Sequence, residues 1–282
     1  MKRKISFVGV GNMASAILMG ITSRDNEPVS WSDIVLFDTQ NEKTEPYANK
    51  GAYIAHDLNE ALRISECIIL CVKPQNFSEI LPLLSSIEGI EKKLIISIAA
   101  GISTEIITRA ANGAPTVRVM PNTPMLIGQG VSALCRTQNV SDDDFDFACE
   151  IFSSAGHIIK ISEDDMNRII CVTGSSPAYV FMMIKAMFDG AKEQGLLKSE
   201  GSVTGISEKE LLDAICDTII GSAQLMKSGN KSPVEQIQTV CSKGGTTEQA
   251  VAELEKYKFY EAFSSAMLKC TKRADELGKS DK

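Results

Sequence analysis

The 282-residue sequence predicts an α/β fold: a Rossmann-like, largely parallel sheet with helices in the first part, and an all-α second part. Up to about residue 162, short apolar runs alternate with helical stretches, a pattern typical of βαβ units. Beyond that point apolar residues recur only at three- and four-residue spacing, so no further strand is expected. We therefore predict two domains, residues 1–162 and 163–282.

The first strand is expected at 5–8, directly before a glycine turn and an amphipathic helix. Gly9, Gly11 and Ala14 form the pattern G-x-G-x-x-A, the dinucleotide-binding fingerprint of a Rossmann-type domain. The first glycine permits the tight turn, the second lets a pyrophosphate approach, and the helix N-terminus offers N–H groups to the phosphates. The structural alternative is a tight strand-to-helix turn without a ligand. Cofactor contacts are predicted for Val8, Gly9, Val10, Gly11, Asn12 and Met13.

The remaining strands are expected as short apolar runs that end at a polar residue, a glycine or a proline. Asp57, Ser103 and Ser141 are expected to cap helices between these strands. Ligands of open α/β sheets bind beyond the carboxyl ends of the strands, so the loops that follow strands form the candidate site. The predicted runs are 34–37, 67–72, 94–100, 116–120, 131–135 and 157–161.

Three polar side chains lie in such loops. Asp38 is placed to bond the adenosine ribose, or is simply a polar strand end. Lys73, in the loop Cys71-Val72-Lys73-Pro74, is placed to bond a ribose or phosphate, or is a solvated lysine. Asn122 either faces the nicotinamide from a rigid turn between two prolines or bonds its own backbone. Because no arginine follows Asp38 to pair with a 2′-phosphate, we expect a preference for NADH over NADPH.

The helical part contains two further features of interest. The run 178–188 is apolar around almost the whole helix, so we expect it to be buried on all sides, with a second subunit helping to cover it. In the stretch 241–249, Gly244 and Gly245 permit a turn with exposed N–H groups. Thr246 and Gln249 fit a T-x-x-Q capping box for the next helix. This arrangement suits a substrate carboxylate, or is an ordinary capped turn between helices.

Composition excludes several classes of function. The net charge of −7, without a basic patch, argues against a nucleic-acid or membrane-surface partner. No apolar run is expected to reach the ~18 residues of a membrane span. The eight cysteines form no C-x-x-C pair and lie mostly in apolar runs, which predicts free thiols in a reducing cytoplasm. With two histidines, no metal site is expected.

Five short motifs in order extend over nearly the whole chain. Read together, they resemble the pyrroline-5-carboxylate reductase family, whose members catalyse the last step of proline biosynthesis. The two C-terminal motifs are the more specific, because many dehydrogenases share the first. The motifs are GVGNMA (9–14), VKPQ (72–75), MPNTP (120–124), GSSPAY (174–179) and SKGGTT (242–247).

The resemblance implies an N-terminal domain that binds NADPH or NADH and a helical domain through which subunits dimerise, often into larger rings. It implies that 1-pyrroline-5-carboxylate is the substrate and L-proline the product. It also implies a catalytic hydroxyl on Thr247. Lys243 departs from the proline usual in the family, and so does 236–238, where the family is more charged. Proline would stiffen the turn, whereas lysine adds attraction for a carboxylate. The substrate contacts implied are Ser242, Gly244, Gly245, Thr246 and Thr247.

Two other readings remain open. A β-hydroxyacid dehydrogenase would share the two-domain plan, but it needs a lysine–asparagine helix, and no asparagine follows Lys185. A non-catalytic NAD(P)-binding relative is the second alternative. Reduction of a cyclic imine needs mainly alignment of the two rings, which agrees with a chain whose two histidines lie outside every motif.

Overall fold

The computed structural model describes residues 3–22, 29–197 and 205–277, and the chain divides into two compact units. Unit 1 comprises Met1–Pro177 together with Met267–Lys282, and unit 2 comprises Ala178–Ala266. The boundaries of these units differ from the predicted boundary at residues 162 and 163. The segment that follows residue 162 and the end of the C-terminal helix both pack with the sheet and therefore belong to unit 1.

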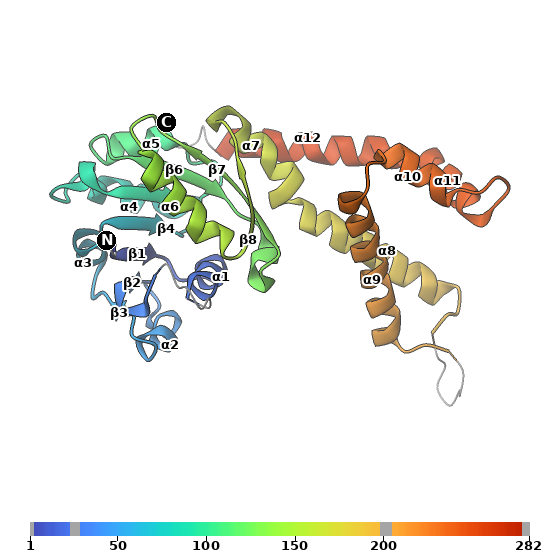
Figure 1. Cartoon of the computed structure of the whole chain (residues 1–282), viewed down its shortest axis with the longest axis horizontal. Helices are drawn as coiled ribbons and strands as arrows, with labels where there is room; N and C mark the ends of the chain where they lie inside the picture. The colour runs from blue at the N-terminus through green and yellow to red at the C-terminus, as the bar shows by residue number, and fades with distance from the viewer. Residues whose placement is uncertain (1–2, 23–28, 198–204, 278–282) are drawn as a thin grey trace. The chain divides into compact units, whose positions relative to one another are not determined.

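The described part of unit 1 contains one sheet of eight strands in the order β3-β2-β1-β4-β5-β6-β7-β8 (Figure 1). Strands β1 to β6 run parallel, β7 is antiparallel to β6, and β8 is parallel to β7. The predicted fold class is therefore confirmed. The strands are β1 (Ile5–Val8), β2 (Ile34–Phe37), β3 (Tyr53–Ile54), β4 (Cys67–Leu70), β5 (Leu94–Ser97), β6 (Thr116–Met120), β7 (Gly130–Arg136) and β8 (Gly156–Lys160).

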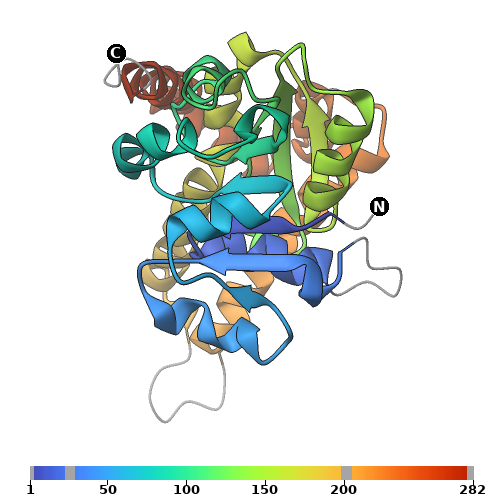
Figure 2. The ribbon, with the colours of Figure 1, turned by 90° about the vertical axis from the view of Figure 1, so that its left-hand side faces the viewer.

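Helices cover both faces of this sheet (Figures 1 and 2). Alternate residues of a strand point to opposite faces, so Ile69 packs with one helical layer while Ile68 and Leu70 pack with the other. The first layer consists of α1 (Asn12–Ile21) and α6 (Asp142–Ser153). The second consists of α3 (Leu58–Ile64), α4 (Phe77–Leu84) and α5 (Thr104–Ala110), and the short α2 (Glu45–Ala48) lies between β2 and β3. Asp57, Ser103 and Ser141 cap α3, α5 and α6 as predicted.

Beyond β8, the chain continues through η6 (Glu163–Asp165), α7 (Met166–Ile169) and a π-helical turn, η7 (Ile170–Gly174), all in unit 1. Arg118 of β6, only 2% exposed, donates hydrogen bonds to Glu163 (2.7 Å) and Asn167 (2.8 Å). Asn167 in turn donates to Asp275 near the C-terminus over 2.9 Å. This chain of hydrogen bonds runs from the buried Arg118 to the surface and links both segments to the sheet.

The described part of unit 2 is helical, as the sequence predicts, apart from one isolated β-bridge between Leu197 and Ile206. The helices are most of α8 (Ser176–Glu193), α9 (Glu208–Ser228), α10 (Pro233–Val240), α11 (Thr246–Lys256) and the first part of α12 (Phe259–Leu277). Ser207 with Glu210, and Ser232 with Glu235, form complete capping boxes at the starts of α9 and α10.

The apolar stretch of α8 is not buried within one chain. Phe181 is 64% exposed and Met182 is 71% exposed, so the expected burial on all sides requires other surfaces. By length and composition alone, the stretch Glu163–Glu193 could cross a membrane. Only 11% of its most apolar 18-residue segment is buried. The expectation that no run approaches that length was therefore wrong. Subunit-interface helices share this composition.

Candidate cofactor and substrate sites

The glycine loop after β1 has the geometry of a phosphate-binding turn. Gly9 has a φ of +89°, and a Cβ at this position would lie 3.0 Å from the Cys71 carbonyl oxygen, so only glycine fits. A Cβ at Gly11 would meet no atom within 4 Å, which leaves open space beside the backbone. Helix α1 begins at Asn12 without a side-chain cap, so its first N–H groups face this space unshielded. The loop therefore fits a pyrophosphate.

Hydrogen bonds join this loop to the ends of the two neighbouring strands. The N–H of Gly9 donates to the Phe37 carbonyl, and the N–H of Cys71 donates to the Val8 carbonyl, both over 2.8 Å. The loops 9–13 and 72–75, both expected at the candidate site, therefore converge, and the end of β2 lies beside them. The strand order reverses between β1 and β4, where ligands of such sheets bind.

Asp38 lies at the centre of this convergence, with its carboxylate already engaged. One oxygen accepts from the Val10 N–H over 2.8 Å, and the other accepts from the Gln40 N–H over 3.0 Å. The ammonium group of Lys43 lies 3.5 Å from the second oxygen. This cation was not predicted, because only an arginine directly after the strand was expected to balance the charge of Asp38.

The other predicted cofactor residues fall into two groups. Val8 and Val10 are 1% and 3% exposed, so only their backbone can contribute to a ligand site. Asn12 is exposed and Met13 is half-buried.

In the loop after β4, Cys71 and Val72 pack against Gly9, and Pro74 begins the turn η3 (Pro74–Asn76). Burial raises the pKa of the Cys71 thiol, which therefore stays protonated and uncharged. Lys73 is exposed beside this loop.

Asn122 has long-range partners that neither interpretation of the sequence foresaw. Its side chain is 8% exposed; it donates to the Thr173 carbonyl over 3.0 Å and accepts from the Val131 N–H over 2.8 Å. Asn122 therefore joins the end of β6 to β7 and to the π-helical turn. It does not close a turn on its own backbone.

The loop between α10 and α11 forms a type II turn from Ser242 to Gly245. The Gly245 N–H donates to the Ser242 carbonyl over 2.9 Å, and Gly244, the third residue of the turn, has a φ of +76°. A positive φ at the third position alone defines this turn type, which accepts proline at its second position, here Lys243.

The predicted capping role of Thr246 was wrong. Gly245 is the N-cap of α11, Thr246 is the first helical residue, and no side chain caps this end. The T-x-x-Q pattern fails because Thr246 already has helical geometry. Thr247 is half-buried and lines an apolar groove of about 390 Å³ within unit 2. The groove also contains Met226, Ile237 and Val251.

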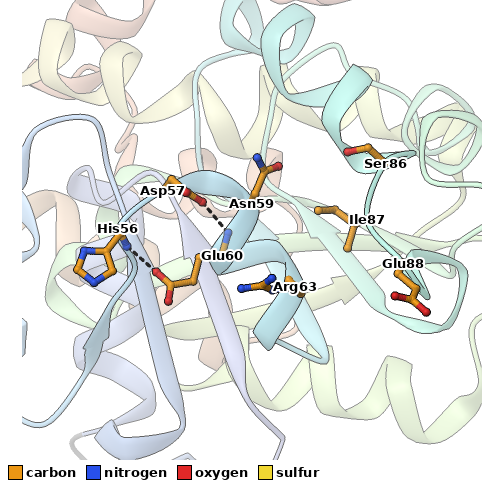
Figure 3. A pocket seen from close by; sticks show the side chains of 8 residues that line it. All are labelled: His56, Asp57, Asn59, Glu60, Arg63, Ser86, Ile87 and Glu88. Carbon is orange, nitrogen blue, oxygen red and sulfur yellow. Dashed lines mark hydrogen bonds between the residues drawn. The ribbon is translucent and has the colours of Figure 1, made fainter.

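A second open groove, of about 600 Å³, lies between α3 and the loop after α4 (Figure 3). Its polar groups mostly serve the start of α3: Glu60 accepts from the His56 N–H over 2.7 Å, and Asp57 accepts from the Glu60 N–H over 2.7 Å. The Tyr53 hydroxyl also donates to Glu60 and lowers the pKa of that carboxyl. The side chains of Asp57 and Glu60 in this groove are therefore accounted for by their hydrogen bonds at the start of α3.

Comparisons with known proteins agree over the whole length. Residues 163–277 match the family description "Pyrroline-5-carboxylate reductase dimerisation", and residues 4–101 match "NADP oxidoreductase coenzyme F420-dependent". The pyrroline-5-carboxylate reductase of Synechocystis is 33% identical over 99% of this chain and 100% of its own. The Escherichia coli enzyme of the same name is 31% identical, with the same coverage.

Solved structures give the same result. The NADP-bound pyrroline carboxylate reductase of Plasmodium falciparum is 25% identical, covers 98% of each chain and superimposes with a TM-score of 0.86. A pyrroline-5-carboxylate reductase from Coxiella burnetii is 28% identical, covers 99% of this chain and 100% of its own, and has a TM-score of 0.84. From its full-length identity and its fold, the chain belongs to the pyrroline-5-carboxylate reductase family.

Proposed function

We propose that this protein reduces 1-pyrroline-5-carboxylate to L-proline with NADPH or NADH. The main evidence is the 33% identity to the pyrroline-5-carboxylate reductase of Synechocystis over 99% of this chain. The glycine loop after β1 and the turn before α11 both have ligand-binding geometry, which supports the assignment. The solved structure of the Plasmodium falciparum reductase contains NADP, which supports the use of a nicotinamide cofactor.

The cofactor residues are assigned from the geometry of unit 1. The N–H groups at the start of α1 and the open space beside Gly11 hold the pyrophosphate. Asp38 and Lys43 face the adenosine ribose from the end of β2, and Lys73 adds a cation from the loop after β4. The nicotinamide ring, when bound, supplies the hydride.

The substrate residues are assigned to the turn 242–247 and the start of α11. N–H groups of this segment bind the carboxylate, and the hydroxyl of Thr247 bonds the ring nitrogen. If the imine enters protonated, adding one hydride to its carbon gives the secondary amine directly, so no side chain has to move a proton. The residues of this chain therefore act mainly by aligning the ring and excluding water.

The helical segment also supports self-association. Residues 163–277 match a dimerisation domain, and the exposed apolar stretch of α8 needs a covering surface. We propose a cytoplasmic homodimer, extended into a larger ring where dimers associate further. A second subunit on α8 accounts for its composition without a membrane.

One assay separates this proposal from the two alternatives. Oxidation of NADPH and NADH is followed at 340 nm with pyrroline-5-carboxylate, and in the reverse direction with β-hydroxyacids and NADP⁺ or NAD⁺. A reductase oxidises the reduced cofactor only with the imine. A β-hydroxyacid dehydrogenase reduces the oxidised cofactor with hydroxyacids, and a non-catalytic relative binds the cofactor without turnover. Either of these last two results would overturn the proposed function.

A further inference from the structure

The carboxylate of Glu248 occupies part of the proposed substrate-binding turn. It accepts a hydrogen bond from the Gly244 N–H over 2.8 Å. Glu248 is the third residue of α11, from which a glutamate usually reaches back to the N-cap N–H. Here the N-cap is Gly245, whose N–H is already bonded to the Ser242 carbonyl, so the glutamate bonds one residue further back.

This contact changes which donors remain for a substrate. The N–H groups of Gly244 and Gly245 are both already bonded, to the Glu248 carboxylate of α11 and to the Ser242 carbonyl. Thr246 and Thr247 begin the helix, and N–H groups at these positions have no acceptor within the helix. Given the proposed function, the substrate carboxylate is therefore left with the Thr246 and Thr247 N–H groups.

The same contact supplies the rigidity that this turn otherwise lacks. A type II turn is pre-organised by proline at its second position, because the ring fixes φ near the value required. This chain has Lys243 there. The bond from Gly244 to Glu248 instead ties the third residue of the turn to the helix.

From this geometry we infer that Glu248 is a positioning residue for substrate binding. It holds the turn 242–245 in the conformation that presents the Thr246 and Thr247 N–H groups, in place of a proline at 243. This inference rests on the proposed function, since it assumes that the turn binds the substrate. The negative charge of Glu248 opposes an incoming carboxylate, so its contribution to substrate binding comes from its hydrogen bond and not from its charge.

The test compares Glu248→Ala, Glu248→Gln and the double variant Lys243→Pro with Glu248→Ala. We expect Glu248→Ala to raise the KM for pyrroline-5-carboxylate about tenfold while kcat stays within about twofold, because one charge-assisted hydrogen bond is lost from the turn. Glu248→Gln keeps an acceptor oxygen, so its KM should stay within about threefold of the parent value. Adding Lys243→Pro to Glu248→Ala should bring KM back to within about threefold.

Glu255→Ala is the matched control, because it removes a charge from an exposed residue of the same helix. Hydrogen exchange of the 241–249 peptide, followed by mass spectrometry, gives a readout independent of turnover. Exchange should quicken in Glu248→Ala and slow again when Lys243→Pro is added. NADPH affinity should be unchanged throughout.

An unchanged KM in Glu248→Ala would overturn the inference, and a lower KM would overturn it and make Glu248 an electrostatic competitor of the substrate. Failure of Lys243→Pro to restore KM would overturn it as well. Thr247→Ala, assayed in parallel, keeps the two proposals distinct. If it lowers kcat/KM while Glu248→Ala has no effect, only the positioning role fails. If neither variant has an effect, the substrate binds elsewhere and the proposed substrate site fails too.

Discussion

The carboxylate of Asp38 accepts a hydrogen bond from the backbone N–H of Val10 over 2.8 Å, so the acid at the end of β2 helps to fix the glycine loop. Asp38 was expected to bond the adenosine ribose or to be a polar strand end, and neither expectation includes this contact with the glycine loop. Its second oxygen lies 3.5 Å from the ammonium group of Lys43, which partly neutralises the charge. The repulsion expected for a 2′-phosphate is therefore weaker than the sequence indicates.

Lys43→Gln should weaken NADPH binding more than NADH binding, because it leaves the charge of Asp38 unbalanced near the extra phosphate. Lys43 is partly exposed, so we expect only a two- to fivefold increase in the NADPH Kd, or roughly 0.5–1 kcal/mol. Fluorescence titration of both cofactors measures the effect, with exposed Lys92→Gln as the control. An equal loss for the two cofactors would contradict this explanation.

The two glycines of the first loop should respond differently to alanine. Gly9→Ala forces a methyl group to 3.0 Å from the Cys71 carbonyl at a positive φ, which should cost at least ~1–2 kcal/mol of unfolding free energy. Gly11→Ala meets no protein atom within 4 Å, so stability should change by less than ~0.5 kcal/mol.

Gly11→Ala should nevertheless weaken NADPH binding about tenfold or more, because the methyl group occupies the space assigned to the pyrophosphate. Thermal unfolding and NADPH titration of both variants separate the two effects. A stable Gly11→Ala protein with unchanged NADPH affinity would show that the cofactor phosphates do not bind at this loop.

Thr247→Ala should lower kcat/KM about ten- to a hundredfold, which corresponds to ~1–3 kcal/mol for the loss of one hydrogen bond near the reacting centre. Glu255→Ala is the control, because Glu255 is an exposed residue of the same helix outside the proposed substrate site. NADPH affinity should be the same in both variants. Full activity of Thr247→Ala would show that its hydroxyl does not contact the substrate.

Association should depend on the apolar stretch of α8. Phe181→Glu or Met182→Glu places a charge where another subunit is proposed to pack, and should weaken self-association by at least ~2 kcal/mol, or roughly thirtyfold in Kd. The interface should bury more than ~2,000 Å² in total. Sedimentation velocity at micromolar concentration measures the loss, and exposed Glu193→Lys on the same helix is the control. A parent protein that is a folded, active monomer would refute the dimer.

Local signals predicted most of the fold. Strand 34–37 is found with those bounds, because a four-residue apolar run between polar residues has one simple solution. The serine and aspartate caps were also confirmed, since a cap acts on an N–H three residues away. The two-residue strand β3 was missed because Tyr53 and Ile54 form no periodic run.

Features that depend on distant partners could not be read from the sequence. Asn122 bonds Thr173, 51 residues further along the chain, and no local pattern identifies such a contact. Lys43 reaches Asp38 only because a short helical turn folds back beside the strand end. Thr246 matched a capping pattern, yet the helix starts one residue earlier than that pattern requires.

The return of α12 to unit 1 has a consequence for synthesis of the protein. Ala274 is 4% exposed in a cluster with Met120 and Met166, and Asp275 accepts the hydrogen bond of Asn167. The sheet unit therefore cannot complete its core on the ribosome until the segment around Ala274 has been synthesised. At about 5–20 residues per second, translation of the intervening unit 2 leaves that patch uncovered for roughly 5–20 s. During this interval the exposed apolar patch is accessible to chaperones that bind nascent chains.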